Sequence, residues 1–80
     1  GIANELNVFP CPTNGQAMIS WNQNTVPLNI TLINAVGQEL EKITIAGNLA
    51  KVDMTSYPSG IYFVRFDTEH FRIYKKIIRE

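Results

Sequence analysis

Apolar and polar residues alternate along most of this chain, in short runs that are interrupted by turn residues about every ten positions. Alternation is typical of strands with one buried face, and regular interruption is typical of a sandwich or barrel. None of these runs has the helical spacing of apolar residues. The pattern therefore predicts an all-β chain.

Seven runs are expected to form strands. They cover residues 6–9, 17–22, 28–33, 38–46, 49–54, 61–66 and 71–78. In three of these runs, residues 17–22, 28–33 and 49–54, one parity is predicted to face the core. The residues assigned to the core in this way are Ala17, Ile19, Trp21, Leu28, Ile30, Leu32, Ala50, Val52 and Met54.

One run breaks the alternation. Between Gln38 and Ala46, Leu40 has the opposite parity to Ile43 and Ile45. A slip of one residue turns a strand's side chains to the other face, so a bulge or bend is expected here. The last two runs carry apolar residues of both parities, which favours a central position for residues 61–66. These two runs are expected to pair as a hairpin.

Short strands with a single apolar face need a second layer to cover them. The economical solution is a seven-stranded antiparallel β-sandwich of the immunoglobulin-like type, and an open barrel is the alternative. The 80 residues fit one domain spanning positions 1–80, in which residues 1–4 are expected to be the remnant of a linker.

Composition and charge narrow the classes of function. With 45% hydrophobic and 18% charged residues, the chain is expected to fold rather than to remain disordered. Seven basic and seven acidic side chains give a net charge of zero, so no nucleic-acid partner is expected. Neither a membrane span nor a Sec signal is visible. The basic residues gather late in the chain, at Arg65, Arg72, Lys75, Lys76 and Arg79.

Catalytic or metal-binding residues are sparse. Cys11 is the sole cysteine and His70 is the sole histidine, and neither has a partner at the spacing of a metal site or of a nucleophile and its base. We expect Cys11 to be a loop or rim residue and His70 to be an exposed turn residue. The chain is expected to be no enzyme and to need no cofactor.

Three blocks of sequence and the final strand carry a resemblance to a known family. They are residues 6–15 (LNVFPCPTNG), residues 32–40 (LINAVGQEL), residues 52–64, which contain the specific YPSGIY, and residues 75–79 (KKIIR). On these residues the chain resembles the type IX secretion sorting domain of the Por secretion tail type, found at the C-termini of proteins exported by Bacteroidetes. Two positions depart from the family pattern: Cys11, where Asn is usual, and Tyr57, where Leu is common.

The resemblance implies a sorting signal that is read in its folded form. An N-terminal cargo domain of the same polypeptide would reach the periplasm by another signal, and the type IX outer-membrane translocon would then recognise this domain. A surface sorting protease would remove it. The cargo would end at the cell surface or in the extracellular medium.

Two groups of residues are expected to matter for this role. Lys75, Lys76 and Arg79 are expected to contact the translocon, although the same charges would also protect an exposed edge strand from aggregation. Residues of the family motif and its turns are Pro10, Pro12, Gly15, Gly37, Gly60 and Tyr62. The glycines are expected to serve turns with positive φ, and Tyr62 is expected to be buried with its hydroxyl at the rim. Unpaired edge strands also make a homodimer an expectation.

A carbohydrate-binding or adhesion module is the competing function, because small β-sandwiches serve both roles. A sugar platform would use the side chains of Trp21, Tyr57, Tyr74, Asn22 and Asn24. However, Trp21 shares the parity of the core residues of its strand, whereas a stacking platform needs an exposed indole. An exposed Trp21 would favour this alternative.

Overall fold

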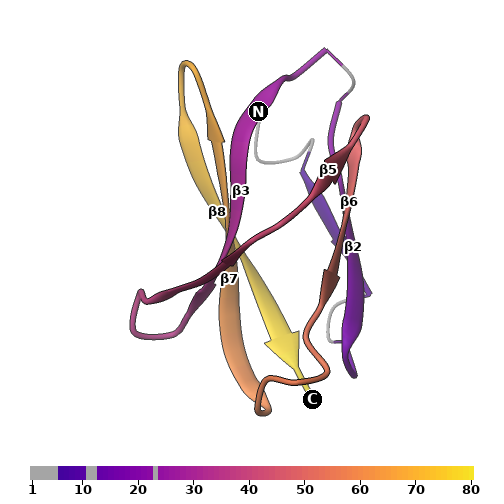
Figure 1. The fold of residues 1–80 in the computed structure, drawn as a ribbon, viewed down its shortest axis with the longest axis vertical. Coiled ribbons are helices and arrows are strands. Elements are labelled where there is room, and N and C mark those ends of the chain that lie inside the picture. The colour runs from indigo at the N-terminus through magenta and orange to yellow at the C-terminus, as the bar shows by residue number, and fades with distance from the viewer. Residues whose placement is uncertain (1–5, 11–12, 23) are drawn as a thin grey trace.

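The computed structural model describes residues 6–10, 13–22 and 24–80, which form two antiparallel four-stranded sheets packed face to face (Figure 1). The linker expected at residues 1–4, Cys11 and Pro12 lie outside these residues. The described part contains no helix, and therefore none that could cross a membrane. The all-β prediction and the two antiparallel layers are confirmed.

The strand order is β1-β2-β6-β5 in the first sheet and β4-β3-β7-β8 in the second. The strands are β1 (Asn7–Phe9), β2 (Gln16–Ser20), β3 (Pro27–Asn34), β4 (Glu39–Lys42), β5 (Ile45–Ala46), β6 (Leu49–Asp53), β7 (Gly60–Thr68) and β8 (Arg72–Arg79). β7 and β8 pair as an antiparallel hairpin, as the sequence predicted.

The prediction of seven strands is wrong, because the run from Gln38 to Ala46 forms two strands in different sheets. β4 pairs with β3 in the second sheet, and β5 pairs with β6 in the first. Between them Ile43 is buried, and its N–H donates to the carbonyl of Ile30 (2.8 Å). Within β4 the register on β3 shifts at Leu40, because Leu32 lies opposite Glu41 and Ile33 lies opposite Glu39, so the expected bulge or bend is present. Beyond it the chain crosses from the second sheet to the first.

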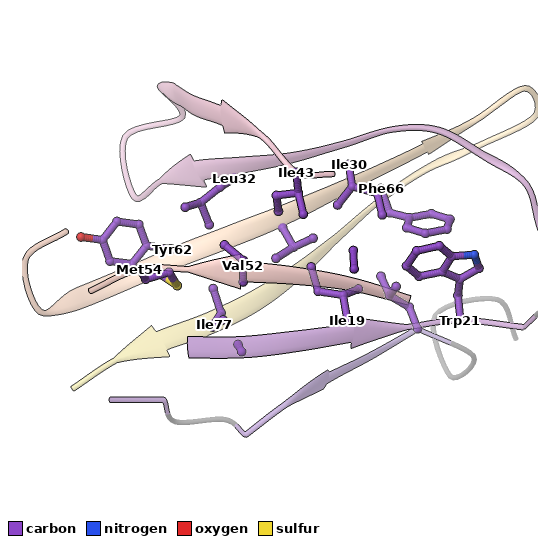
Figure 2. Close-up of a cluster of buried hydrophobic side chains, with 14 residues drawn as sticks. Ile19, Trp21, Ile30, Leu32, Ile43, Val52, Met54, Tyr62, Phe66 and Ile77 are labelled. Carbon is purple, nitrogen blue, oxygen red and sulfur yellow. The ribbon is translucent and has the colours of Figure 1, made fainter. Parts of the chain in front are cut away.

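Buried apolar side chains from both sheets fill the space between them (Figure 2). All of the predicted core residues are buried except Leu28, which is 60% exposed. The register of β3 on β7 shifts between Pro27 and Asn29, so Leu28 is an extra residue in a bulge. The bulge breaks the parity that predicted its burial, and alternation with Ile30 inward resumes after it.

The two sides of the sandwich differ in how they are closed. On one side the chain itself crosses between the sheets from β4 to β5. On the other side the edge strands are β1 and β8. Thr13 makes a parallel bridge to the end of β8, where its N–H donates to the Ile78 carbonyl (2.8 Å) and its carbonyl accepts from the Glu80 N–H (2.8 Å). This side is therefore bridged at one end of the sandwich.

Candidate functional site

Turns and strand ends from four separate parts of the chain meet at one end of the sandwich, which we call the motif end (lower part of Figure 1). It consists of residues 13–16, 34–37, 54–60 and 78–80. The β7–β8 turn at residues 69–71 and the β5–β6 turn at Gly47 and Asn48 lie at the other end, which we call the hairpin end.

Thr13 is the central contact of the motif end. Its side chain is fully buried, its hydroxyl donates to the Gln16 carbonyl (2.7 Å), and the same oxygen accepts from the Gly15 N–H (3.2 Å). The backbone of Thr13 meanwhile bonds both Ile78 and Glu80. One threonine thus fixes the turn before β2 and attaches it to the end of β8.

Gly15 is held by a close approach to the segment after β6. Its carbonyl accepts from the Met54 N–H (2.6 Å), and its φ is +152°. A Cβ at this position would lie 2.6 Å from Cγ2 of Thr55, well inside van der Waals contact. Both the backbone conformation and the lack of space therefore require glycine.

Tyr62 connects the core to the turn that precedes β7. Its ring is buried, and its hydroxyl donates to the Pro58 carbonyl (2.5 Å). The ring of Tyr57 packs beside it, with centroids 6.1 Å apart and planes inclined by 45°. Figure 2 shows Tyr62 beside Met54 at one end of the core and Trp21 beside Phe66 at the other.

The β3–β4 turn is fixed by the side chain of Asn34. Its Oδ1 accepts from the N–H groups of Val36 (3.1 Å) and Gln38 (2.9 Å), and Gly37 adopts a φ of +89°. This geometry leaves Val36 87% exposed at the tip. A shallow groove of about 350 Å³ separates the turn from residues 57–62. The motif end therefore has a rigid, partly apolar surface.

The model of the secretion system C-terminal sorting domain family matches residues 7–80. The chain belongs to this family. The match begins at the start of β1 and includes every strand and every turn of the motif end. No curated protein matches the chain. As a type IX sorting domain, the chain is the signal that directs an attached N-terminal cargo, through the type IX machinery, to the cell surface or beyond.

The three cations expected to contact the translocon do not share one face of the sorting domain. Lys75 and Arg79 lie opposite Val64 and Gly60 on β7, whereas Lys76 is exposed on the other face of β8. Nε of Arg79 donates to the Met54 carbonyl (3.1 Å), and its guanidinium also donates to the Glu80 carbonyl. Arg79 therefore belongs to the motif end, and the two lysines lie along the strand that leads to it.

Gly60, Pro10 and Pro12 are the remaining family-motif residues. Gly60 begins β7 with a φ of +154°, and no atom lies within 4 Å of where its Cβ would be. Pro10 is exposed directly after β1, and Pro12 lies outside the described residues. Sequence reasoning missed Thr13, because a polar residue in a turn gives no signal that it will be buried.

A network of ion pairs lies near the hairpin end of the sorting domain. Asp67 accepts from Arg72 (2.5 Å) and Arg65 (3.2 Å), and Arg65 also pairs with Glu39 (2.9 Å). Burial alone would raise the pKa of the Asp67 carboxyl, but the two guanidinium groups outweigh burial and hold this pKa below its ordinary value. Arg65 and Asp67 are two residues apart and therefore share one face of β7, and this spacing is the feature of the sequence from which their ion pair could have been predicted.

The aromatic residues considered for a sugar platform lie apart. Trp21 is only 4% exposed and makes an edge contact with Phe66, with ring centroids 5.3 Å apart. Tyr57 borders the groove of the motif end, and Tyr74 lies opposite Arg65 on the outer face of β7 and β8. The prediction that Trp21 points into the core is confirmed, so its indole provides no stacking surface.

Metal-binding side chains do not gather in the part of the chain that the structure describes. Residues 6–10, 13–22 and 24–80 contain no group of three His, Cys, Asp or Glu side chains that would hold a metal ion. His70 lies exposed in the β7–β8 turn, where its N–H donates to Oγ1 of Thr68 (3.2 Å).

Proposed function

We propose that the type IX outer-membrane translocon recognises this sorting domain as a folded unit, through the motif end and the cations of β8. One observation carries the proposal. Three segments of the motif end that are far apart in sequence, residues 13–16, 54–60 and 78–80, are joined by hydrogen bonds of Thr13, Gly15 and Arg79. The fourth, residues 34–37, is placed beside them by the pairing of Asn34 with Tyr62. An unfolded chain would not present this arrangement, so recognition of the motif end would report that the domain has folded.

The direction of β1 supports different roles for the motif end and the hairpin end. β1 pairs antiparallel with β2, with Asn7 opposite Ser20 and Phe9 opposite Met18. The chain therefore runs from the hairpin end toward the motif end as it enters the sandwich. An N-terminal cargo would lie at the hairpin end, leaving the motif end accessible to the translocon. The surface protease that removes the domain would act on the cargo side.

The route that we propose for the protein is the one that membership of the family implies. The cargo reaches the periplasm by another signal, and the domain, with residues 1–80 as a single unit, is recognised there. Cleavage then leaves the cargo at the cell surface or in the medium. The immunoglobulin-like type of the sandwich also remains a prediction from the sequence.

The cations of β8 give the proposal its most specific test. Residues 1–80 are fused to a periplasm-targeted fluorescent reporter and expressed in a type IX-competent strain and in a translocon-deficient strain. We expect reporter outside the outer membrane in the competent strain alone. Replacing Lys75 and Lys76 together by Gln should lower export by about fivefold, as expected if contact residues are lost.

Lys51→Gln is the matched control, because Lys51 is an exposed lysine on β6 in the other sheet. It should export like the unmodified domain. Equal export by the double variant and this control would show that the β8 lysines make no contact. Retention of the folded, unmodified fusion in the periplasm would contradict the proposed recognition as a whole.

A further inference from the structure

β8 is the longest edge strand of the described sandwich. The four edges of the two sheets are β1, β5, β4 and β8, with three, two, four and eight residues. An edge strand exposes a row of backbone donors and acceptors that can pair with another chain. Only β8 is long enough to offer several such groups in register.

The bridge to Thr13 shows which groups of β8 point outward. The Ile78 carbonyl and the Glu80 N–H both bond Thr13, away from β7. Backbone groups alternate in direction along an antiparallel strand, and the β7–β8 register has no shift, so Tyr74 and Arg72 also direct their backbone groups outward. In residues 6–10, 13–22 and 24–80, no backbone or side-chain group bonds these outward groups of Tyr74 or Arg72.

Charge distinguishes this edge from the others. β8 carries Arg72, Lys75, Lys76 and Arg79 and has no acidic residue between its ends. Asp67 on the neighbouring strand pairs with Arg72. A strand added beside β8 would therefore gain from carboxylates placed near these cations.

The apolar residues of β8 indicate where the partner strand would carry apolar side chains. Ile73 is half-buried against the core, and the Tyr74 ring is 56% exposed on the outer face. Side chains of an added strand would alternate between these two faces. The inward ones would cover Ile73 at the side of the sandwich that lacks the β4–β5 crossover, and the outward ones would lie near Arg72.

We propose that the open edge of β8 accepts an extended partner segment with alternating acidic and apolar residues, which adds a ninth strand to the sandwich. The bridge by Thr13 occupies the C-terminal end of this edge, so the partner pairs with the stretch around Arg72 and Tyr74. This inference adds to the proposed recognition by the translocon a second contact, on the part of β8 toward the hairpin end, and rests on that recognition for the identity of the partner.

A second copy of this chain fits the edge less well. Pairing of β8 with another β8 would bring like charges together, which is unfavourable. The edge strand β4 is acidic and offers Glu39 and Glu41, but it has only four residues and Glu39 already pairs with Arg65. Charge therefore favours a different polypeptide over a homodimer.

The test uses the 80-residue chain and a fluorescently labelled seven-residue peptide of alternating Glu and Val, with binding measured by fluorescence anisotropy. A Ser/Val peptide of the same length should bind about fivefold more weakly, and added salt should weaken binding of the acidic peptide alone. Amide hydrogen exchange without any substitution should show new protection at Tyr74 and Arg72. Protection confined to other strands, or no binding, would overturn the proposal.

A pair of variants separates backbone pairing from side-chain contact. Tyr74→Pro removes an outward donor while leaving the bonds between β7 and β8 intact, and should weaken binding at least about tenfold. Tyr74→Thr also loses the ring but keeps the N–H, and should change affinity by no more than about threefold. Equal binding by the two variants would exclude strand addition.

Two further outcomes identify what occupies the edge. Concentration-dependent dimerisation by sedimentation, competed by the peptide, would contradict the proposal in favour of a second copy. Because the assay contains no translocon, absence of peptide binding alongside normal export would remove strand addition and leave the sorting role intact. If the Lys75 and Lys76 double variant bound the peptide normally but was not exported, the two lysines would act in a contact with the translocon other than the added strand.

Discussion

The two ends of this small sandwich are held together by different kinds of interaction. At the motif end, backbone hydrogen bonds join residues far apart in sequence, such as Thr13 with Ile78 and Gly15 with Met54. At the hairpin end most bonds among the described residues are local, as between Thr68 and Phe71, although Trp21 and Asn48 bond each other across a long stretch of chain. The motif end therefore exists as a surface only after long-range folding.

The largest expected effect comes from Gly15→Ala. The new Cβ would lie 2.6 Å from Cγ2 of Thr55, and the φ of +152° is unfavourable for alanine. We expect the free energy of unfolding to fall by about 2–3 kcal/mol in chemical denaturation. Adding Thr55→Ser removes the clashing methyl group and should restore part of this loss.

Gly37→Ala is the matched control for this change, since Gly37 also has a positive φ but no atom lies within 4 Å of its missing Cβ. It should cost about 1 kcal/mol, from the backbone alone. If Gly15→Ala costs no more than Gly37→Ala, the close approach between Gly15 and Thr55 does not constrain the motif end.

A smaller effect is expected for Tyr62→Phe. The change keeps the buried ring and removes the hydroxyl that donates to the Pro58 carbonyl. Stability should fall by about 1 kcal/mol in thermal or chemical unfolding, the usual contribution of one hydrogen bond. Tyr74→Phe, at an exposed position, should stay within about 0.5 kcal/mol of the unmodified domain. Similar losses in both variants would show that the Tyr62 hydroxyl has no special role.

The third effect appears only in acid and belongs to the hairpin end. The pKa of Asp67 is lowered in the folded state, so its stabilising contribution is present above the ordinary carboxyl pKa and is lost as pH falls through the lowered value. The hydroxyl and N–H of Thr55 also lower the pKa of Asp53, near the motif end, but this carboxyl is exposed. Asp67→Asn should therefore flatten the loss of stability below about pH 4 more than Asp53→Asn does.

Unfolding curves collected between neutral pH and about pH 2.5 measure this difference. If Asp53→Asn flattens the pH dependence as much as Asp67→Asn, the ion pairs with Arg72 and Arg65 do not stabilise the hairpin end in the way that we describe.

Alternation of apolar and polar residues was sufficient to predict most of the strands and much of the core. It failed at Leu28 because a bulge adds one residue to β3, which parity cannot detect before the pairing is known. It also failed to separate β4 from β5. The slip between Leu40 and Ile43 was visible, but a bend and a crossing between sheets leave the same pattern in sequence.

The candidate site was predicted only in part, because sequence blocks do not reveal which of them meet in space. The motif blocks that include Gly15, Gly37 and Gly60 were identified, yet their convergence depends on pairing between distant strands. Arg79 was expected to be a contact residue, and the structure adds its bond to the Met54 carbonyl. A charged residue at a strand end gives no indication of such a bond.

Export by stability-matched variants tests whether the motif end carries the sorting signal. Gly15→Ala disturbs the motif end, and Phe66→Leu disturbs the core beside Trp21 near the hairpin end. Each is fused to the reporter and assayed at a temperature where both domains are folded to the same extent. We predict that Gly15→Ala loses most of its export while Phe66→Leu retains it. Equal export by the two variants would contradict this role of the motif end.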